Sequence, residues 1–121
     1  MQKDPRQISP QMQKELSDFQ LLSQKLDTLY RQKQLYSESL REKESSINEL
    51  ENLGEESTVY RQIGGILIKK ERTVVLEDLK DEKLTLEMRI KSLERNEPSM
   101  KLNYEEMKQK LQKKLNMEQQ M

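Results

Sequence analysis

The chain has 121 residues, of which 32% are hydrophobic and 36% charged, and 22 Lys and Arg balance 22 Asp and Glu. So little apolar surface excludes a conventional globular core and leaves disorder or a long helical architecture with a narrow buried seam. The balanced charge gives no field for nucleic acid, and the absence of Cys and His excludes disulfides, thiol nucleophiles and the usual zinc sites. Without a membrane span or signal peptide, we expect a soluble cytoplasmic protein that needs no cofactor or metal.

Residues 10–53 carry apolar side chains that recur alternately three and four residues apart. The two interleaved series are Met12, Phe19, Leu26, Lys33, Leu40 and Ile47, and Ile8, Glu15, Leu22, Leu29, Tyr36, Lys43 and Leu50. Ten of these thirteen positions are apolar, which indicates a coiled-coil helix rather than disorder. Ser9 and Pro10 predict the N-cap and first turn, Leu53 and Gly54 predict the exit, and residues 1–9 are expected to form a tail.

Residues 58–70 have a different pattern, because two runs with β-branched residues flank Gly64 and Gly65. This predicts a β-hairpin with a two-residue primed turn in which both glycines have positive φ. An isolated hairpin is marginally stable and has two unpaired edges, so we expect it to pair with hairpins of other chains. The alternative is a turn that only covers the end of the helix pair. The residues expected to contribute to assembly are Val59, Tyr60, Ile63, Gly64, Gly65, Ile66, Leu67 and Ile68.

Residues 73–116 repeat the heptad pattern. The two series are Leu79, Leu86, Leu93, Met100, Met107 and Lys114, and Leu76, Lys83, Ile90, Glu97, Tyr104 and Leu111, of which nine of twelve are apolar. Thr73 is the expected N-cap, with Glu71 as the competing position. Pro98 predicts a local break or kink, since proline lacks a backbone donor and clashes with the preceding turn. Residues 117–121 are expected to form a tail.

Two helical arms of matching length around a short insert predict a mostly α fold. We expect a single domain, a long antiparallel two-helix coiled coil joined by one β-hairpin. Opposed positions would sum to about 126, which places Leu50 opposite Leu76 and Phe19 opposite Met107, and a shift of three or four residues is an open alternative.

The arms and the hairpin together resemble the β-class subunit of prefoldin. The family's segment runs Val-Tyr-basic, then glycine, then an apolar strand that ends in Lys. The matching residues here are Val59, Tyr60, Arg61, Gly64, Ile66, Leu67, Ile68 and Lys69. The stretch RQKQLYSESLREKESSINELENL also resembles the family's first helix, and a single hairpin separates the β class from the α class. The resemblance covers nearly the whole chain and fits the archaeal β subunit and the eukaryotic subunit 6, with the Gln-rich first arm closer to the archaeal type, whereas Pro98 departs from the pattern.

The resemblance implies an ATP-independent molecular chaperone. Two α-class and four β-class subunits would form a hetero-hexamer, in which the hairpins build an inter-subunit β-barrel and the coiled coils project from it. Unfolded client proteins would be held at the distal coiled-coil ends and transferred to a group II chaperonin.

Apolar residues gather toward both termini, which an antiparallel arrangement places at the end of the arms away from the hairpin. Met suits a surface that must accept many apolar shapes, because its side chain is flexible and polarizable. The expected client contacts are Met12, Leu16, Phe19, Met107, Leu111, Leu115 and Met117. The alternative is that the seam residues among them are coiled-coil core, and both hold if the helix ends separate.

A basic cluster near the C-terminus has two interpretations. It is a solvated helix face, or it docks an acidic chaperonin rim. Its members are Lys108, Lys110, Lys113 and Lys114.

Other functions fit the sequence less well. An enzyme is not expected, because a two-helix hairpin forms no pocket and Gly64-Gly65 lacks the GK[ST] ending of a phosphate-binding loop. A leucine-zipper DNA binder would need a basic region before the first heptads. A structural coiled-coil scaffold or tether stays open as the main alternative.

Overall fold

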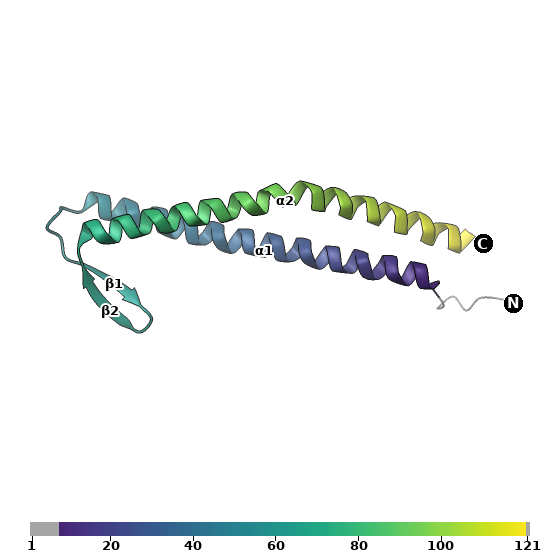
Figure 1. The fold of residues 1–121 in the computed structure, drawn as a ribbon, viewed down its shortest axis with the longest axis horizontal. Helices are drawn as coiled ribbons and strands as arrows, with labels where there is room; N and C mark the ends of the chain where they lie inside the picture. Colours follow the sequence, from purple (N-terminus) through teal and green to yellow (C-terminus); the bar gives the residue numbers. More distant parts are fainter. Residues whose placement is uncertain (1–7, 121) are drawn as a thin grey trace. The chain divides into compact units, whose positions relative to one another are not determined.

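In the computed structural model the chain forms two long helices that are joined by a two-stranded hairpin (Figure 1). The elements are α1 Pro10–Asn52, β1 Val59–Ile63, β2 Ile66–Lys70 and α2 Arg72–Gln120. The structure describes residues 8–120, with side chains as far as residue 117. Residues 1–7 and 121 of the expected tails lie outside the described residues. The predicted fold class, a helix pair with a single antiparallel hairpin, is confirmed.

The observed helix bounds differ from the predicted ones at three ends. α1 ends at Asn52 rather than at residue 53, and α2 begins at Arg72 rather than at residue 73. Residues 117–120, expected as a tail, continue α2. Val75 N–H donates to the carbonyl of Glu71 over 3.1 Å, which makes Glu71 the N-cap position instead of Thr73.

Pro98 does not interrupt the second helix, so the expected break is wrong: α2 is helical on both sides of it. Proline removes only one backbone donor, and the exposed ring lies on the solvent side of the helix. The Ser99 hydroxyl donates to the carbonyl of Asn96 over 3.2 Å, which adds a local hydrogen bond at the same turn. A helix that continues for several turns on each side therefore tolerates the loss of one hydrogen bond.

The start of α1 is capped as its sequence predicts. The Ser9 hydroxyl accepts a hydrogen bond from the backbone N–H of Met12 over 3.1 Å, and the Ser9 carbonyl accepts from Gln13 N–H over 2.9 Å. Pro10 occupies the first helical position, where its missing N–H has no partner to lose.

The end of α1 is capped by the other helix rather than by a glycine. Gly54 does not have positive φ, so it does not form the expected left-handed cap. Instead the Nε of Arg72, the first residue of α2, donates to the carbonyl of Leu50 over 2.6 Å. A guanidinium at this position also complements the negative end of the α1 dipole.

The chain divides into two compact units, each of which contains part of α1 and part of α2. We call Gln32–Leu93, which includes the hairpin, the hairpin unit. The other unit, of which the structure describes residues 8–31 and 94–120, is called the terminal unit.

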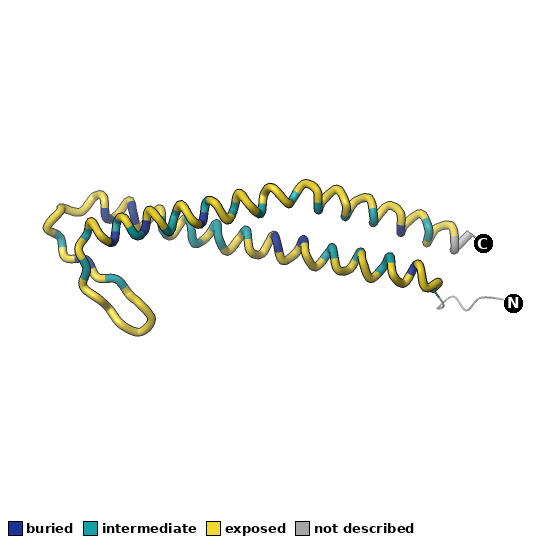
Figure 2. Tube along the Cα trace, viewed as in Figure 1, coloured by how far each residue is buried: buried dark blue, intermediate teal, exposed yellow. Residues whose placement is uncertain are grey.

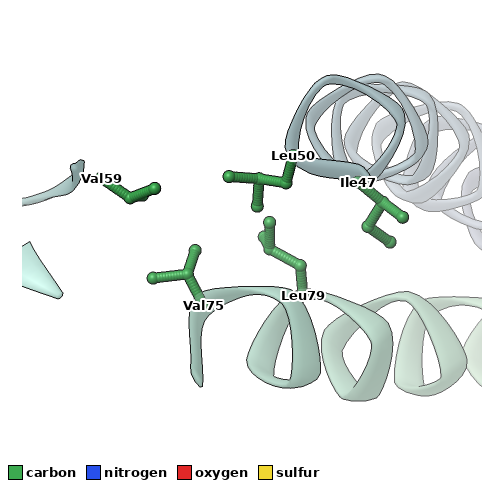
Figure 3. Packing of buried hydrophobic residues seen from close by; sticks show 5 residues of the cluster. All are labelled: Ile47, Leu50, Val59, Val75 and Leu79. Carbon is green, nitrogen blue, oxygen red and sulfur yellow. The ribbon is translucent and has the colours of Figure 1, made fainter. Parts of the chain in front are cut away.

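A compact apolar cluster lies at the base of the hairpin unit. Its buried members come from three elements: α1, β1 and α2 (Figure 3). They are Ile47, Leu50, Val59, Val75 and Leu79, with the half-buried Leu76 packed against them. The hairpin is therefore attached to the helices by the first side chain of β1.

In the terminal unit the two helix segments run antiparallel. The Phe19 and Tyr104 rings stack with centroids 5.0 Å apart, and Lys114 Nζ donates to both carboxylate oxygens of Glu15 over 2.5 and 2.7 Å. The numbers of Phe19 and Tyr104 add to 123 and those of Glu15 and Lys114 add to 129, so the two pairs lie on either side of the expected sum of about 126. Glu15 and Lys114 are both polar seam positions, and their pairing explains why charged residues are tolerated there.

The hairpin turn uses only one left-handed residue. Gly64 has φ of 60°, whereas Gly65 does not have positive φ, so the expectation for both glycines is wrong at Gly65. A positive φ at the first central position is typical of a type II′ turn, which matches strand twist as well as type I′ does. Ile63 pairs with Ile66 across this turn.

Candidate interaction surfaces

The strand register assigns the hairpin side chains to two faces. Residues directly opposite each other share a face, and neighbours along a strand alternate. The pairs Val59↔Lys70, Arg61↔Ile68 and Ile63↔Ile66 share one face, and the pairs Tyr60↔Lys69 and Gln62↔Leu67 share the other. The first face includes both side chains that contact the helices, so we call it the inner face and the second the outer face.

The hairpin exposes most of its apolar side chains, as the exposed tube at β1 and β2 shows (Figure 2). Leu67 is 67% exposed and Tyr60 is 60% exposed, both on the outer face. The exposed apolar residues of the hairpin are Tyr60, Ile63, Ile66, Leu67 and Ile68. Exposed apolar side chains on both faces of so small an element mark a site of protein association.

Val59 differs from the other residues that were predicted to contribute to assembly. Its side chain is 8% exposed and lies in the apolar cluster of the hairpin unit. It is already used within the chain, and it anchors the hairpin instead of extending its exposed surface.

The hairpin edges also carry unpaired backbone groups. In a two-residue hairpin the pair that closes the turn exchanges both hydrogen bonds, and bonded and non-bonded pairs then alternate. From the Ile63↔Ile66 closing pair, this rule places the backbone groups of Gln62 and Leu67 toward the two open edges. Each edge can therefore accept a strand from another chain.

A single carboxylate joins the hairpin to both helices. Arg61 Nη2 on β1 donates to both carboxylate oxygens of Glu82 on α2, over 2.6 and 2.9 Å. Lys43 Nζ on α1 lies 3.2 Å from the same carboxylate. We call these three residues the Glu82 ion-pair cluster, and sequence periodicity gave no signal for it.

The two cations lower the pKa of Glu82. Partial burial alone would raise the pKa of this carboxyl. Hydrogen bonds from Arg61 and Lys43, together with the two positive charges, outweigh burial and hold the pKa below its usual value. The carboxylate is therefore ionised at neutral pH.

The predicted client contacts of the terminal unit fall into two groups. Met12 and Leu111 are buried and Phe19 and Met107 are half-buried, so these four belong to the helix seam in this structure, and Leu16, outside the two seam series, is also half-buried. Leu115 and Met117 are exposed, and Met117 is 65% exposed.

A hollow lies between the helix ends of the terminal unit. It is lined by Ser9, Gln11, Met12, Lys114 and Met117. The start of α1 and the last described turns of α2 therefore meet beside an exposed methionine.

The four predicted docking lysines are not equivalent. Lys108, Lys110 and Lys113 are exposed. The ammonium of Lys114 is half-buried and bound to Glu15, so it is already used within the chain.

Sequence analysis missed several exposed apolar residues outside the seam. They are Leu21, Leu35, Leu84, Met88 and Leu102. The sequence already indicated these residues, because they are apolar and stand at heptad positions outside the two seam series. Across residues 8–120, no helix has a stretch apolar and long enough to cross a membrane, and no acidic group of three or more is arranged to hold a metal ion.

Known proteins match this chain over nearly all of its length. The sequence model of a family described as prefoldin subunit matches residues 13–118. A prefoldin subunit beta of Archaeoglobus fulgidus is 34% identical over 106 residues, which cover 88% of this chain and 91% of that protein. A prefoldin subunit beta of Thermococcus onnurineus is 32% identical over 105 residues, which cover 87% and 90%.

A solved structure agrees with these relatives. The crystal structure of the prefoldin beta subunit from Thermococcus strain KS-1 superimposes with a TM-score of 0.73 at 29% sequence identity. The match covers 91% of this chain and 96% of that one.

Proposed function

Because this chain belongs to the prefoldin subunit family, a family of chaperone subunits, we propose that it acts as a β-class subunit that holds unfolded proteins without ATP. In this proposal four copies assemble with two α-class subunits in the cytoplasm. The hexamer captures clients at the helix ends and transfers them to a group II chaperonin. The observation that carries the proposal is the hairpin, whose apolar side chains are largely exposed in a chain that matches β subunits along its length.

The hairpin supports assembly through both its edges and its outer face. An isolated two-stranded hairpin is marginal in water, and it gains stability when neighbouring strands satisfy its edge groups. Burial of Tyr60 and Leu67 against other subunits would add about 1.5 to 3 kcal/mol for each side chain. Hairpins of neighbouring subunits that pair edge to edge would close a barrel, which removes the open edges altogether.

The terminal unit supports client capture. Leu115 and Met117 are exposed and meet an unfolded chain first. Met12 and Leu111 are buried, and they reach a client only when the helix ends separate. Weak contacts of this kind become effective when several subunits hold one client together, and they still permit release.

Transfer to a chaperonin would use the basic surface near the end of α2. The exposed Lys108, Lys110 and Lys113 lie on the terminal unit and offer a basic surface to an acidic partner. Such contacts are screened over about 8 to 10 Å at ordinary salt, so docking would weaken as ionic strength rises.

Native mass spectrometry tests the proposed assembly. The purified chain is mixed with a recombinant archaeal α-class prefoldin subunit, and we expect a hexamer with four copies of this chain and two of the partner. The mixture should then suppress aggregation of heat-unfolded citrate synthase in the absence of nucleotide. A dimer of this chain that does not bind the α-class subunit would contradict the proposal and favour the coiled-coil scaffold.

A further inference from the structure

The hairpin has few attachments to the rest of its unit. Val59 packs in the apolar cluster at the start of β1, and beyond it the inner face extends past the cluster to the turn. Within the described residues, the bond between Arg61 and Glu82 is the only hydrogen bond or ion pair that joins a hairpin side chain to a helix. β2 is joined to α2 through Glu71 alone, and beyond this backbone link the orientation of the strands depends on Val59 and Arg61, two residues apart on β1.

These two attachments have different geometry. Apolar contact is not directional, so the Val59 side chain alone permits the strands to rotate about their base. The contact between Arg61 and Glu82 is a charge-assisted hydrogen bond at 2.6 Å, and such bonds are short and directional. Lys43 holds the carboxylate from the α1 side at 3.2 Å, so the acceptor itself is fixed between two helices.

We propose that Glu82 is a positioning residue that sets the angle at which the hairpin leaves the helix pair, and thereby prepares its outer face and edges for neighbouring subunits. This inference rests on the proposed assembly through the hairpin. A hairpin that is already oriented loses less conformational freedom on assembly, which strengthens binding without any new contact between chains. Glu82 acts through Arg61 and does not itself touch a partner.

The sequence around Glu82 offers a matched control. Glu77 lies on the same helix, is exposed, and has no hydrogen bond or ion pair within the described residues. Glu82→Gln and Glu77→Gln each remove one negative charge from α2, but only the first releases the hairpin. Far-UV circular dichroism of both variants checks that helix content is unchanged.

The first measurement is made on this chain alone. Since the chain contains no Cys, spin labels can be placed at Gln62→Cys on β1, near the turn, and at Lys91→Cys on α2, both exposed. Labelled chain is diluted with unlabelled chain so that distances within one molecule dominate. We expect one narrow distance distribution in the parent and in Glu77→Gln, and a broadened one in Glu82→Gln. A narrow distribution in Glu82→Gln would overturn the proposal.

The second measurement is the affinity for an archaeal α-class prefoldin subunit. We expect Glu82→Gln to weaken assembly about ten-fold, and Glu77→Gln to change it less than two-fold. Arg61→Gln should weaken it as much as Glu82→Gln, and the double variant should be no weaker than either single variant because both remove the same contact. Additive losses, or an unchanged affinity in Glu82→Gln, would contradict the positioning role.

The two readouts separate this inference from the proposed function. If the parent does not bind the α-class subunit, the proposed assembly is wrong. The distance distributions of the isolated chain then still decide whether Glu82 orients the hairpin.

Discussion

The hairpin unit and the terminal unit differ in how their elements are held together. In the hairpin unit a five-residue apolar cluster joins three elements, and the Glu82 ion-pair cluster joins the same three through one carboxylate. In the described part of the terminal unit two helix segments meet, through buried side chains along a single seam, the ring stack of Phe19 and Tyr104, the cation–π contact of Lys101 with Tyr30, and the ion pair between Glu15 and Lys114.

This difference indicates a division of labour within one chain. A surface that assembles with fixed partners benefits from a rigid base, because orientation is then settled before binding. A surface that accepts many clients benefits from a seam with few cross-links, which can open at low cost. Under the proposed function the same helices would carry both surfaces, and the local contacts would decide how each unit behaves.

The largest expected effect is on assembly. Leu67→Pro removes a backbone donor that the hairpin register directs toward the open edge of β2. We expect the hairpin to persist, and assembly with an α-class subunit to weaken by about ten-fold or more for each inter-subunit hydrogen-bonded contact that is lost. Native mass spectrometry reads out the loss of hexamer.

Leu67→Val is the control for Leu67→Pro, since it keeps the donor and most of the apolar surface. It should still assemble. If the proline variant formed hexamers equally well, this edge would not pair with another chain. The proposed role of the hairpin unit in assembly would then be contradicted.

The next largest effect is expected from substitutions in the turn of the hairpin. Gly64 has φ of 60°, where a side chain costs about 1 to 2 kcal/mol, whereas Gly65 has ordinary φ and no atom within 4 Å of an added Cβ. Gly64→Ala should therefore lower amide-exchange protection of β1 and β2 roughly ten-fold. Gly65→Ala should leave protection equal or slightly raised.

Hydrogen exchange followed by mass spectrometry makes this comparison in the isolated chain. Equal effects of the two alanines would mean that the turn is not of type II′. Protection in the terminal unit should not change in either variant.

A smaller effect is expected on client holding. Leu115→Ser with Met117→Ser removes exposed apolar contacts from the terminal unit, and we expect about five-fold more hexamer to be needed to suppress aggregation of citrate synthase. Leu84→Ser with Met88→Ser changes the same residue types, which are 56% and 64% exposed, in the hairpin unit. That control should suppress aggregation as well as the parent does. If both double variants needed the same excess of hexamer, client contacts would not be confined to the terminal unit.

The smallest effect is the pH dependence of the hairpin base. The folded pKa of Glu82 is lowered, so its contribution is present above the unfolded value of about 4.3 and is lost as pH falls through the folded pKa. The charged groups around it are Lys43 and Arg61, and Asp81 and Arg89 line a hollow of the hairpin unit together with Lys43 and Glu82. Because the lowered pKa leaves Glu82 only partly protonated at pH 4, we expect less than about a five-fold change in assembly between pH 7 and pH 4.

Comparison with Glu82→Gln isolates this titration from that of other carboxylates. The difference in affinity between parent and variant should be present at pH 7 and should shrink below about pH 4. A difference that stays constant down to pH 3 would mean that ionised Glu82 does not contribute.

Most of the fold could be predicted because its signals are local. Heptad spacing gives the helices, Ser9 and Pro10 mark the start of α1, and two glycines between β-rich runs give the hairpin. Pro98 was misjudged because propensity describes an isolated position, whereas a long helix with bonds on both sides continues past it.

The missing parts depend on contacts between elements far apart in the sequence. Arg61 and Glu82 are 21 residues apart, and neither heptad nor strand periodicity indicates that they meet. Val59 reads as one more exposed strand residue until α1 and α2 are placed around it. The sequence therefore predicted that the hairpin carries exposed apolar residues, but not which contacts attach the hairpin to the helices.

The bond from Arg72 to Leu50 also has a consequence for engineering. It joins the two ends of the connecting segment, so residues 51–71 form a loop that is closed at its root. Loop-closure entropy rises only with the logarithm of length, by about 0.6 kcal/mol for each doubling. We therefore expect that strands of other lengths can be grafted between these two points when Val59 and Arg61 are kept, which would make the rest of the hairpin exchangeable for building new assemblies on the same helices.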